Sequence, residues 1–567
     1  MKPQTNKRYL SKYDVLWQLR KEQKAKRNAE KRVQYWKQKF DDQCIEMDKE
    51  DHDDLAYIIR TVKKEDVPEN MECLLEQQKQ ILQTTSNNGY RWHPKIIRLC
   101  LELYCKNPHV LEPLRQFMKL PSNRTIRWHK NKMEQETGWH DNILSWCLKE
   151  AKEKNLKEAD LWGGFVIDEM KIQENLEMVM TNGKHKLVGL VDLGEHHEAM
   201  NRLSGNTEPE LATQVLQFIF LGDNGFRFPI AQFPSRSCTP SALYFIFWEG
   251  VKKMWQFDFI IYWCILDGAD CNRQFVQLHF QQTSAVEKQF VTYNMYTGSS
   301  MVFIMDPKHN IKKIRNNITK SNLQGKPRHL QFQGNSITWM QFKNAFMWDQ
   351  RNFTLPLHEK LTLQHFDLDS ASKMRNHLAE DVLDKKMLFL MQKHADCLDV
   401  CGDDGESLRS TVALLEHTSA LVSIFSDKLT ISTRNDGRIK KLMAFYEFMK
   451  KWREECQEKE KNNQFVSSKL WFDIQSMCLG FRSMVTIKLE RFPNSVIKPA
   501  IINQDCVENH FCQVRACNGQ NNNPTYRQQQ STQNSIRFGQ TTISRKSNAG
   551  KFSSDTNKLS ACSLPLS

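Results

Sequence analysis

Alternating runs of apolar and polar residues divide the middle of the chain into short strands and helices. Helical apolar spacing marks two segments, 206–222 and 241–255. Apolar runs typical of strands occupy 161–170, 184–194, 226–235, the first part of 257–275, and 301–306. Strands that alternate with helices predict an α/β domain whose sheet is buried on both faces.

The N-terminal pattern is different. Ala29, Val33, Trp36 and Phe40 follow the spacing of one helical seam, which predicts a basic amphipathic helix within residues 1–50. Such a seam fits a short coiled coil, and a solvated single helix fits it equally well. The polar and acidic sequence that follows, 51–88, is typical of a linker, and the serine-rich end of the chain, 531–567, predicts a disordered tail.

Residues 89–150 contain short helical patterns separated by prolines. Pro121 and Ser122 come directly before a basic, aromatic helix that carries Arg124, Arg127 and Lys130. A capped basic helix in this position predicts a helix-turn-helix domain that contacts DNA through these three side chains. A helical spacer with a solvated basic face would produce a similar pattern.

Composition narrows the class of protein. The chain has 567 residues, 40% of them apolar and 10% aromatic, which suits several globular domains. No apolar run approaches the roughly 20 residues of a membrane span, so we expect no membrane-spanning segment. The net charge is +14, and residues 1–40 alone hold 13 Lys/Arg against three acids. An excess of this kind favours an anionic partner, and nucleic acid is the first candidate.

Two predicted strands end in a carboxylate, Asp168 in FVID and Asp267 in YWCILD. The carboxyl ends of strands are where an open α/β sheet places reactive groups. Carboxylates from separate elements that converge are the ligands Mg²⁺ prefers in phosphoryl transfer. An ordinary turn or cap residue is the more frequent explanation for a single Asp at such a position.

At this point several strings resemble the P-element family of transposases, including relatives that carry a THAP zinc domain. They follow the family's order across roughly residues 90–528: GGFVIDEMKI (163–172), KLVGLVDLGE (186–195), ILDGADCNRQF (265–275), MDPKHNIKKIRNNI (305–318), LTLQHFDLDSASKMRNHLAEDVL (361–383) and INQDCVENHFCQVRACNGQNNNPTYRQ (502–528). The resemblance implies a multidomain α/β protein. Its ribonuclease-H-like core would occupy 160–305 and 499–530, interrupted by a helical insertion at 306–498.

The resemblance also implies site residues. An Asp-Asp-Glu triad that binds Mg²⁺ falls on Asp168, Asp267 and Glu508. Asp192 is a rival carboxylate, which we interpret as a structural residue at the end of its strand. All three triad positions are intact, and this favours a catalytic chain.

For GTP, which the family's insertion binds, the matching residues are Asp505 and, less closely, Asp427. Candidate phosphate partners are the cations of one basic segment, Lys308, Lys312, Lys313 and Arg315. A solvated basic helix face explains any one of them equally well.

The N-terminus departs from the family. The Cys and His spacing of a THAP domain is missing, so we predict no structural zinc, and DNA contacts would fall to the basic helix and residues 89–150. The implied function is that of a homo-oligomeric nuclear transposase that cuts and joins double-stranded DNA with Mg²⁺ and GTP. The alternative is a domesticated, non-catalytic protein that binds DNA or a protein partner.

Overall fold

The protein is described by a computed structural model that divides into two units, Met1–Thr85 and Ser86–Ser567. The described residues are 26–28, 30, 31, 34, 69–83 and 91–538 without 134, 182–183, 206–207, 281–289 and 403. The predicted basic helix at 1–50 lies outside this part of the chain, except for the six positions between 26 and 34, which are helical.

The expected linker at 51–88 contains a helix, α3 (Glu69–Gln83). Leu74, Gln77 and Ile81 recur at helical spacing, and the last two are buried. The linker prediction is therefore wrong over α3, because the high density of Glu and Gln hid a helical periodicity.

Between residue 91 and the sheet, the second unit contains the α-helices α4 (Pro94–Lys106), α5 (Leu111–Leu114), α6 (Asn123–Asn131) and α7 (Asp141–Glu153). The hydroxyl of Ser122 caps α6 by accepting a hydrogen bond from the Thr125 amide at 3.1 Å. Helix α4 packs against α5 and α6, whereas α7 packs against the sheet and α9. The segment predicted as one helix-turn-helix domain is thus shared between a small helical cluster and the covering of the sheet.

The sheet has the strand order β5-β4-β1-β6-β8-β7. Its strands are β1 (Trp162–Lys171), β4 (Gln214–Gly222), β5 (Arg227–Ser235), β6 (Ile260–Leu266), β7 (Val291–Tyr293) and β8 (Ser300–Met305). Strands β1, β6 and β8 are parallel, and the other pairings are antiparallel. A separate hairpin joins β2 (Glu177–Thr181) to β3 (Lys184–Val188).

The helix predicted at 206–222 is wrong. Residues 214–222 form β4, which pairs with β1 and β5. Its side chains are buried on both faces of the sheet, so nearly all of them are apolar and the two-residue alternation of a strand disappears. The run Val215–Leu221 then mimics a helical face.

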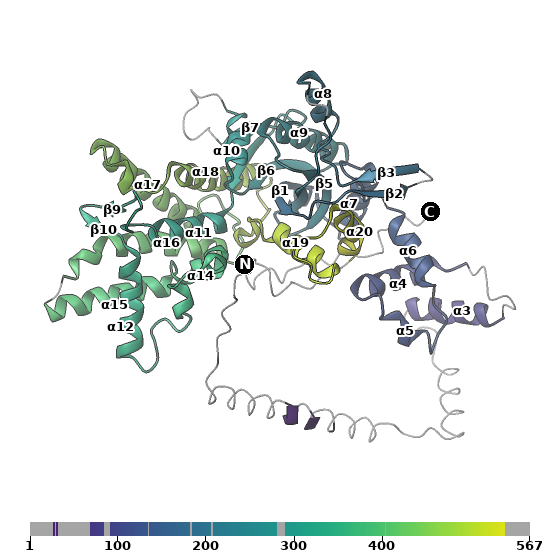
Figure 1. Cartoon of the computed structure of the whole chain (residues 1–567), viewed down its shortest axis with the longest axis horizontal. Helices are drawn as coiled ribbons and strands as arrows, with labels where there is room; N and C mark the ends of the chain where they lie inside the picture. Colours follow the sequence, from purple (N-terminus) through teal and green to yellow (C-terminus); the bar gives the residue numbers. More distant parts are fainter. Residues whose placement is uncertain are drawn as a thin grey trace, which may run out of the picture. The chain divides into compact units, whose positions relative to one another are not determined.

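Helices cover both sides of this sheet, with α9 (Pro240–Gln256) on one side and α19 (Asp505–Cys517) and α20 (Tyr526–Arg537) on the other (Figure 1). Two shorter helices complete this region, α8 (Glu195–Leu203) and α10 (Asp270–Gln277).

Helix α20 extends into the expected disordered tail and is largely buried. Several of its polar side chains are hydrogen-bonded inside the fold: Asn534 donates to the carbonyls of Lys130 and Met133 at 2.8 and 3.0 Å, and Arg537 donates to the Pro229 carbonyl at 3.1 Å. The rest of the predicted tail, 539–567, lies outside the described residues.

Between β8 and α19 the chain is mostly helical. The elements are α11 (Pro307–Ile318), β9 (Gln331–Phe332), β10 (Asn335–Ser336), α12 (Trp339–Asn352), α13 (Ser370–Met374), α14 (Asn376–Asp381), α15 (Lys385–Cys401), α16 (Arg409–Ser426), α17 (Gly437–Glu458) and α18 (Ser468–Arg491). Single 3₁₀ turns lie at Glu158–Leu161, Leu363–His365, Glu406–Leu408, Asn462–Gln464 and Pro499–Ile501. Across the described ranges no helix has the length and apolar character needed to cross a membrane.

Helix α18 lies directly on β8. A Cβ at Gly480 would come within 2.5 Å of the Phe303 carbonyl oxygen, so only glycine allows this approach. The Ser476 hydroxyl donates to the same carbonyl at 2.9 Å and accepts from the Met305 amide at 3.1 Å. The helical segment is therefore anchored to the central sheet through α18.

A second anchor is the buried ion pair between Lys488 of α18 and Asp223, with Nζ and Oδ2 2.7 Å apart. Asp223 also accepts from the Tyr262 hydroxyl and, at 2.9 Å, from the Trp263 indole, and Lys488 donates to the Trp162 carbonyl at 3.1 Å. Each charge is compensated only while its partner is present.

We therefore expect Lys488→Met to lower the free energy of unfolding by about 3–5 kcal/mol, because it leaves a buried carboxylate without its cation. Lys343→Met, which removes the cation of the exposed pair with Asp367, should cost about 0–1 kcal/mol. Urea unfolding followed by circular dichroism measures both. Equal losses in the two variants would contradict the assignment of Lys488 as an anchor.

Candidate functional site

Three aspartates share one row at the carboxyl edge of the parallel strands. Val166 pairs with Ile265, and Ile265 pairs with Ile304. Continued by two residues, this register places Asp168, Asp267 and Asp306 at the ends of three neighbouring strands, which lie about 4.8 Å apart where they pair. The two carboxylates predicted from the sequence are thus adjacent, and Asp306 is a third that the sequence analysis missed.

Asp168 lies just beyond the part of β1 that pairs with β6. Strand β1 continues to Lys171 against β4, but its pairing with β6 ends at Val166. One carboxylate oxygen of Asp168 accepts from the Glu169 amide at 2.8 Å. Asp168, where the sequence placed the strand end, therefore lies two residues beyond the parallel pairing and three residues before β1 itself ends.

Asp267 follows β6 directly and orients the start of α10. Its Oδ1 accepts from the Ala269 amide at 3.0 Å and from Asn272 Nδ2 at 2.5 Å.

Glu508 reaches this edge on the first turn of α19. The Gln504 side chain donates to the Ile167 carbonyl at 2.7 Å, and its backbone amide donates to Asp306 Oδ2 at 2.8 Å. The start of α19 is therefore attached to both β1 and the end of β8, 337 and 198 residues away in sequence. Glu508 itself is largely buried, and its Oε2 has no hydrogen-bond partner.

Asp306 has a different role from its neighbours in the row. It caps α11 by accepting from the Lys308 and His309 amides at 2.6 and 3.1 Å. His309 Nδ1 lies 3.2 Å from Asp306 Oδ2, and its Nε2 lies 3.8 Å from Glu508 Oε1. The signal in the sequence was the Asp directly after the apolar run MVFIM, in a segment interpreted above only as a source of cations.

Burial and neighbouring charges shift the pKa values of several carboxyl groups at this edge. Removal from water raises the pKa of Asp168 well above its usual value, and neighbouring Asp267 and Glu508 raise it further. Burial also raises the pKa of Glu508. Burial alone would raise the pKa of Asp306, but His309 and the backbone donors bring it down to about 2. Burial alone would lower the pKa of His309. The neighbouring Asp306 carboxylate outweighs that effect, so the pKa of His309 is raised.

These carboxylates suit a hard cation by chemistry. Asp168 and Glu508 are acidic groups in a water-poor setting, and the unpaired Oε2 of Glu508 is an open acceptor. Within the described ranges, however, no three Asp, Glu, His or Cys side chains lie close enough together to ligate one ion. The carboxylates lie at one edge of the sheet but do not converge on one point. Mutual repulsion between negative charges is consistent with this arrangement.

The residues proposed for GTP are not gathered in one place. Asp505 is ion-paired with Lys308, and Asp427, at the end of α16, is paired with Arg438 at 2.9 Å. A cavity of about 560 Å³ among α15, α16 and α17 includes Asp427 in its wall, but the residues described there include neither Asp505 nor Lys312. None of these contacts tests GTP binding, which stays a prediction of the resemblance.

The basic segment of α11 is not a solvated face. Lys313 pairs with Asp473 at 2.8 Å, and Arg315 is buried and donates to the Lys373 carbonyl at 2.6 Å. Lys312 is also buried; the loss of water lowers its pKa, and Glu508 opposes that effect. Lys312 is therefore a buried cation of this segment whose charge interacts with Glu508 and Asp306.

The predicted DNA-contacting residues separate into two groups. Arg124 and Arg127 are exposed on α6. Lys130 is half-buried and donates to the Ser531 carbonyl and the Ser535 hydroxyl of α20, each at 3.3 Å. Lys130 therefore joins α6 to α20, and the two arginines are the groups available to a partner.

Asp192 stays apart from the row. Its backbone amide donates to the Pro234 carbonyl at 3.0 Å, and its Oδ1 accepts from the Gly194 amide at 3.3 Å. This is the turn geometry of a structural carboxylate.

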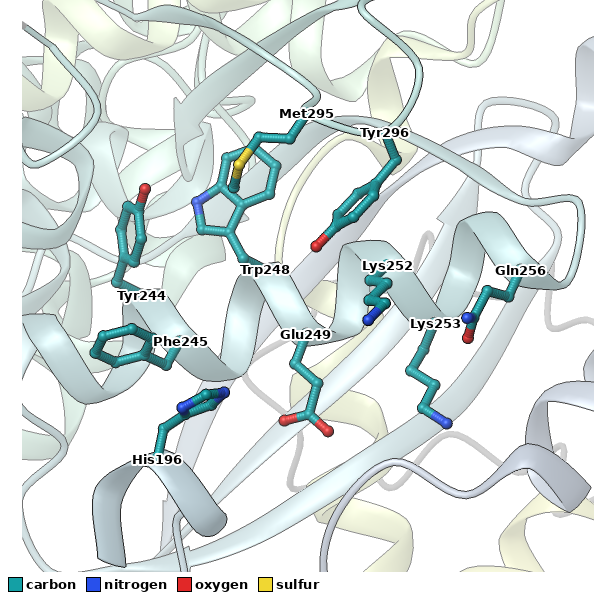
Figure 2. A pocket seen from close by; sticks show the side chains of 10 residues that line it. All are labelled: His196, Tyr244, Phe245, Trp248, Glu249, Lys252, Lys253, Gln256, Met295 and Tyr296. Carbon is teal, nitrogen blue, oxygen red and sulfur yellow. The ribbon is translucent and has the colours of Figure 1, made fainter. Parts of the chain in front are cut away.

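A cavity of about 490 Å³ follows the outer face of α9 (Figure 2). Its wall contains stacked His196 and Phe245 rings, 5.1 Å apart, and Glu249 and Lys252 further along. None of its described lining residues belongs to the acidic row.

Two family models match the parts of the chain that contain Asp168, Asp267 and Glu508. Residues 135–279 match the model "TNP-like, RNase H N-terminal domain", and residues 501–532 match "TNP-like, RNase H C-terminal domain". The solved "Drosophila P element transposase strand transfer complex" is similar in fold, with a TM-score of 0.64 and 17% sequence identity over 82% of this chain and 96% of that chain. No curated protein matches the chain.

The raised pKa of Asp168 has a consequence for stability. The folded state binds the Asp168 proton more tightly than the unfolded chain, so the carboxylate lowers stability once the pH rises above the usual Asp pKa. We expect Asp168→Asn to stabilise the metal-free protein at pH 7, by a few degrees in Tm, where roughly 2–4 °C corresponds to 1 kcal/mol.

The gain should shrink as the pH falls toward 4, because the wild-type carboxyl is then protonated. Asp369→Asn is the control, since Asp369 caps α13, its pKa is lowered by its hydrogen bonds to Ser372, and the amide should give no gain. Thermal unfolding in EDTA between pH 4 and 8 measures both variants. A loss of stability at pH 7 in Asp168→Asn would show that the carboxylate is a satisfied structural group.

Proposed function

Because the chain belongs to the P-element-type transposase family, we propose that it is a DNA transposase that cleaves and joins DNA strands by divalent-metal-dependent phosphoryl transfer. The observation that supports the proposal is that Asp168, Asp267 and Glu508 lie near the same edge of the sheet, where Asp267 and Glu508 both raise the pKa of Asp168. Strand pairing brings the two aspartates together, and the contacts of Gln504 bring Glu508 to them.

In this proposal Asp168, Asp267 and Glu508 hold Mg²⁺. The metal, when bound, supplies the positive charge that stabilises the attacking and leaving oxygens of a phosphodiester. The chain's own contribution is positional: Asn272 orients Asp267, and Gln504 fixes the start of α19. Lys312 and His309 add positive charge beside Glu508. Water is the proposed nucleophile for cleavage, and a freed 3′-hydroxyl the nucleophile for joining.

Double-stranded DNA is the proposed substrate, and α6 the proposed contact outside the acidic edge. Exposed Arg124 and Arg127 share this helix with Trp128, which is 61% exposed. Basic side chains next to an exposed aromatic ring suit a phosphate backbone and the bases beside it. The structural relative is a transposase strand transfer complex, which supports a DNA substrate here.

The alternative is a non-catalytic DNA-binding protein derived from such a transposase. The three intact carboxylates favour the enzyme, since a chain that only binds DNA has no use for Glu508 as a buried acid with an unpaired oxygen.

The first test removes one charge at the acidic edge. Glu508→Gln should abolish Mg²⁺-dependent strand cleavage but keep most DNA affinity, because the amide preserves shape and loses the charge that holds a dication. A labelled duplex, selected from a random pool for binding, serves as substrate in cleavage gels and in binding titrations.

Asp192→Asn is the matched control and should cleave as the wild type does, since Asp192 only stabilises a turn. Wild-type rates in Glu508→Gln would refute the catalytic proposal. Undetectable cleavage by the wild type on every selected duplex, with DNA binding intact, would favour the non-catalytic alternative.

The second test concerns α6. Replacing both Arg124 and Arg127 by alanine should weaken binding to the selected duplex more than binding to random DNA, by about 1–3 kcal/mol for each lost base contact. A double variant of two exposed lysines in the loop after α11, Lys320→Ala/Lys326→Ala, removes the same charge at another surface. Equal effects of the two double variants in fluorescence anisotropy would show that α6 contributes only general positive charge.

A further inference from the structure

A buried ion-pair cluster lies directly behind the loop that carries Asp267. The side chain of Asp473, on α18, is fully buried, and its two carboxylate oxygens accept from Arg273 Nε and Nη2, both at 2.8 Å. Lys313 of α11 donates to Asp473 Oδ2, also at 2.8 Å. One carboxylate of the helical segment thus connects α10, α11 and α18.

This cluster packs against the backbone next to Asp267. A Cβ at Gly268 would lie 1.9 Å from Lys313 Nζ, 2.2 Å from Asp473 Oδ2 and 2.8 Å from Arg273 Nη2. Gly268 is therefore in contact with three charged groups at once. On the other side, the Asp267 carboxylate is held by Asn272. The loop is confined from both sides.

The cluster depends on the negative charge of Asp473. Arg273 retains a second partner, Asp270, at 2.8 Å, but the only ion pair described for Lys313 is with Asp473. Without that carboxylate, two neighbouring cations would repel each other in a water-poor region. Their separation would release the backbone at Gly268.

We propose that Asp473 is a positioning residue that sets the place of the Asp267 carboxylate through Arg273, Lys313 and the backbone of Gly268. Through Asp473, the helical segment between β8 and α19 helps to position the Asp267 carboxylate for a divalent cation. This inference rests on the proposed function, because it takes Asp267 as a metal ligand.

The experiment measures Mn²⁺ binding by the full chain, from the electron paramagnetic resonance signal of free Mn²⁺. Asp473→Asn should weaken Mn²⁺ binding by roughly 10–100-fold, the range for loss of a group that supports a metal ligand. Lys313→Gln should weaken it in the same direction but less, because Arg273 still holds Asp473. Cleavage by Asp473→Asn should recover at saturating Mn²⁺.

Asp349→Asn is the control for loss of stability alone. Asp349 is equally buried in the helical segment and accepts from the Leu357 and His358 amides at 2.7 and 3.1 Å. It should bind Mn²⁺ as the wild type does. Wild-type affinity in Asp473→Asn and Lys313→Gln, or an equal loss in Asp349→Asn, overturns the inference.

Asp267→Asn separates this inference from the proposed function. If the wild type binds no Mn²⁺, or Asp267→Asn binds it as tightly as the wild type, the metal site itself is wrong and the inference falls with it. If Asp267→Asn loses Mn²⁺ while the Asp473 and Lys313 variants keep it, only the positioning role is wrong. Should Asp473→Asn lack a cooperative thermal transition, Lys313→Gln decides the outcome.

Discussion

The carboxylate of Asp306 is the constraint on which the acidic edge depends. It accepts hydrogen bonds from the first amides of α11 and from Gln504 at the start of α19. Two helix N-termini, each with partial positive charge, therefore meet at one anion at the end of β8. Because α19 must begin there, Glu508 lies one turn later, next to His309. A segment almost 200 residues distant in sequence is placed by a single buried group.

The buried charges of this protein fall into two classes. Most buried cations near the site have a dedicated carboxylate: Lys308 has Asp505, Lys488 has Asp223, and Arg273 and Lys313 share Asp473. Among the described residues, Asp168 has no such cation, and Glu508 has only His309 at 3.8 Å. Desolvated acids without protein counter-ions are costly, so the unbalanced negative charge at this edge is what a bound cation would compensate.

Much of the sheet could be predicted from the sequence, because strands that end in Asp after an apolar run carry a local signal. The register that brings Asp168 beside Asp267 is consistent with those two strand ends. Three features escaped prediction for physical reasons. Strand β4 is buried on both faces and so lacks alternation. Helix α20 is polar yet buried, and tertiary hydrogen bonds such as those of Asn534 compensate part of that burial. Asp306 could not be told from an ordinary helix cap until Gln504 was found to donate to it.

Helix α20 contacts both the basic helix α6 and α19, the helix that carries Glu508. Helix α20 packs against α19, where Gln533 lies 3.3 Å from His510, and it accepts Lys130 of α6 at Ser531 and Ser535. Tyr526, at its start, shares a 2.7 Å hydrogen bond with Thr137. The exposed arginines of α6 are thus attached, through α20, to the helix that carries Glu508. Under the proposed function, a duplex bound by α6 would therefore contact a helix that is joined, through α20, to the helix that carries Glu508.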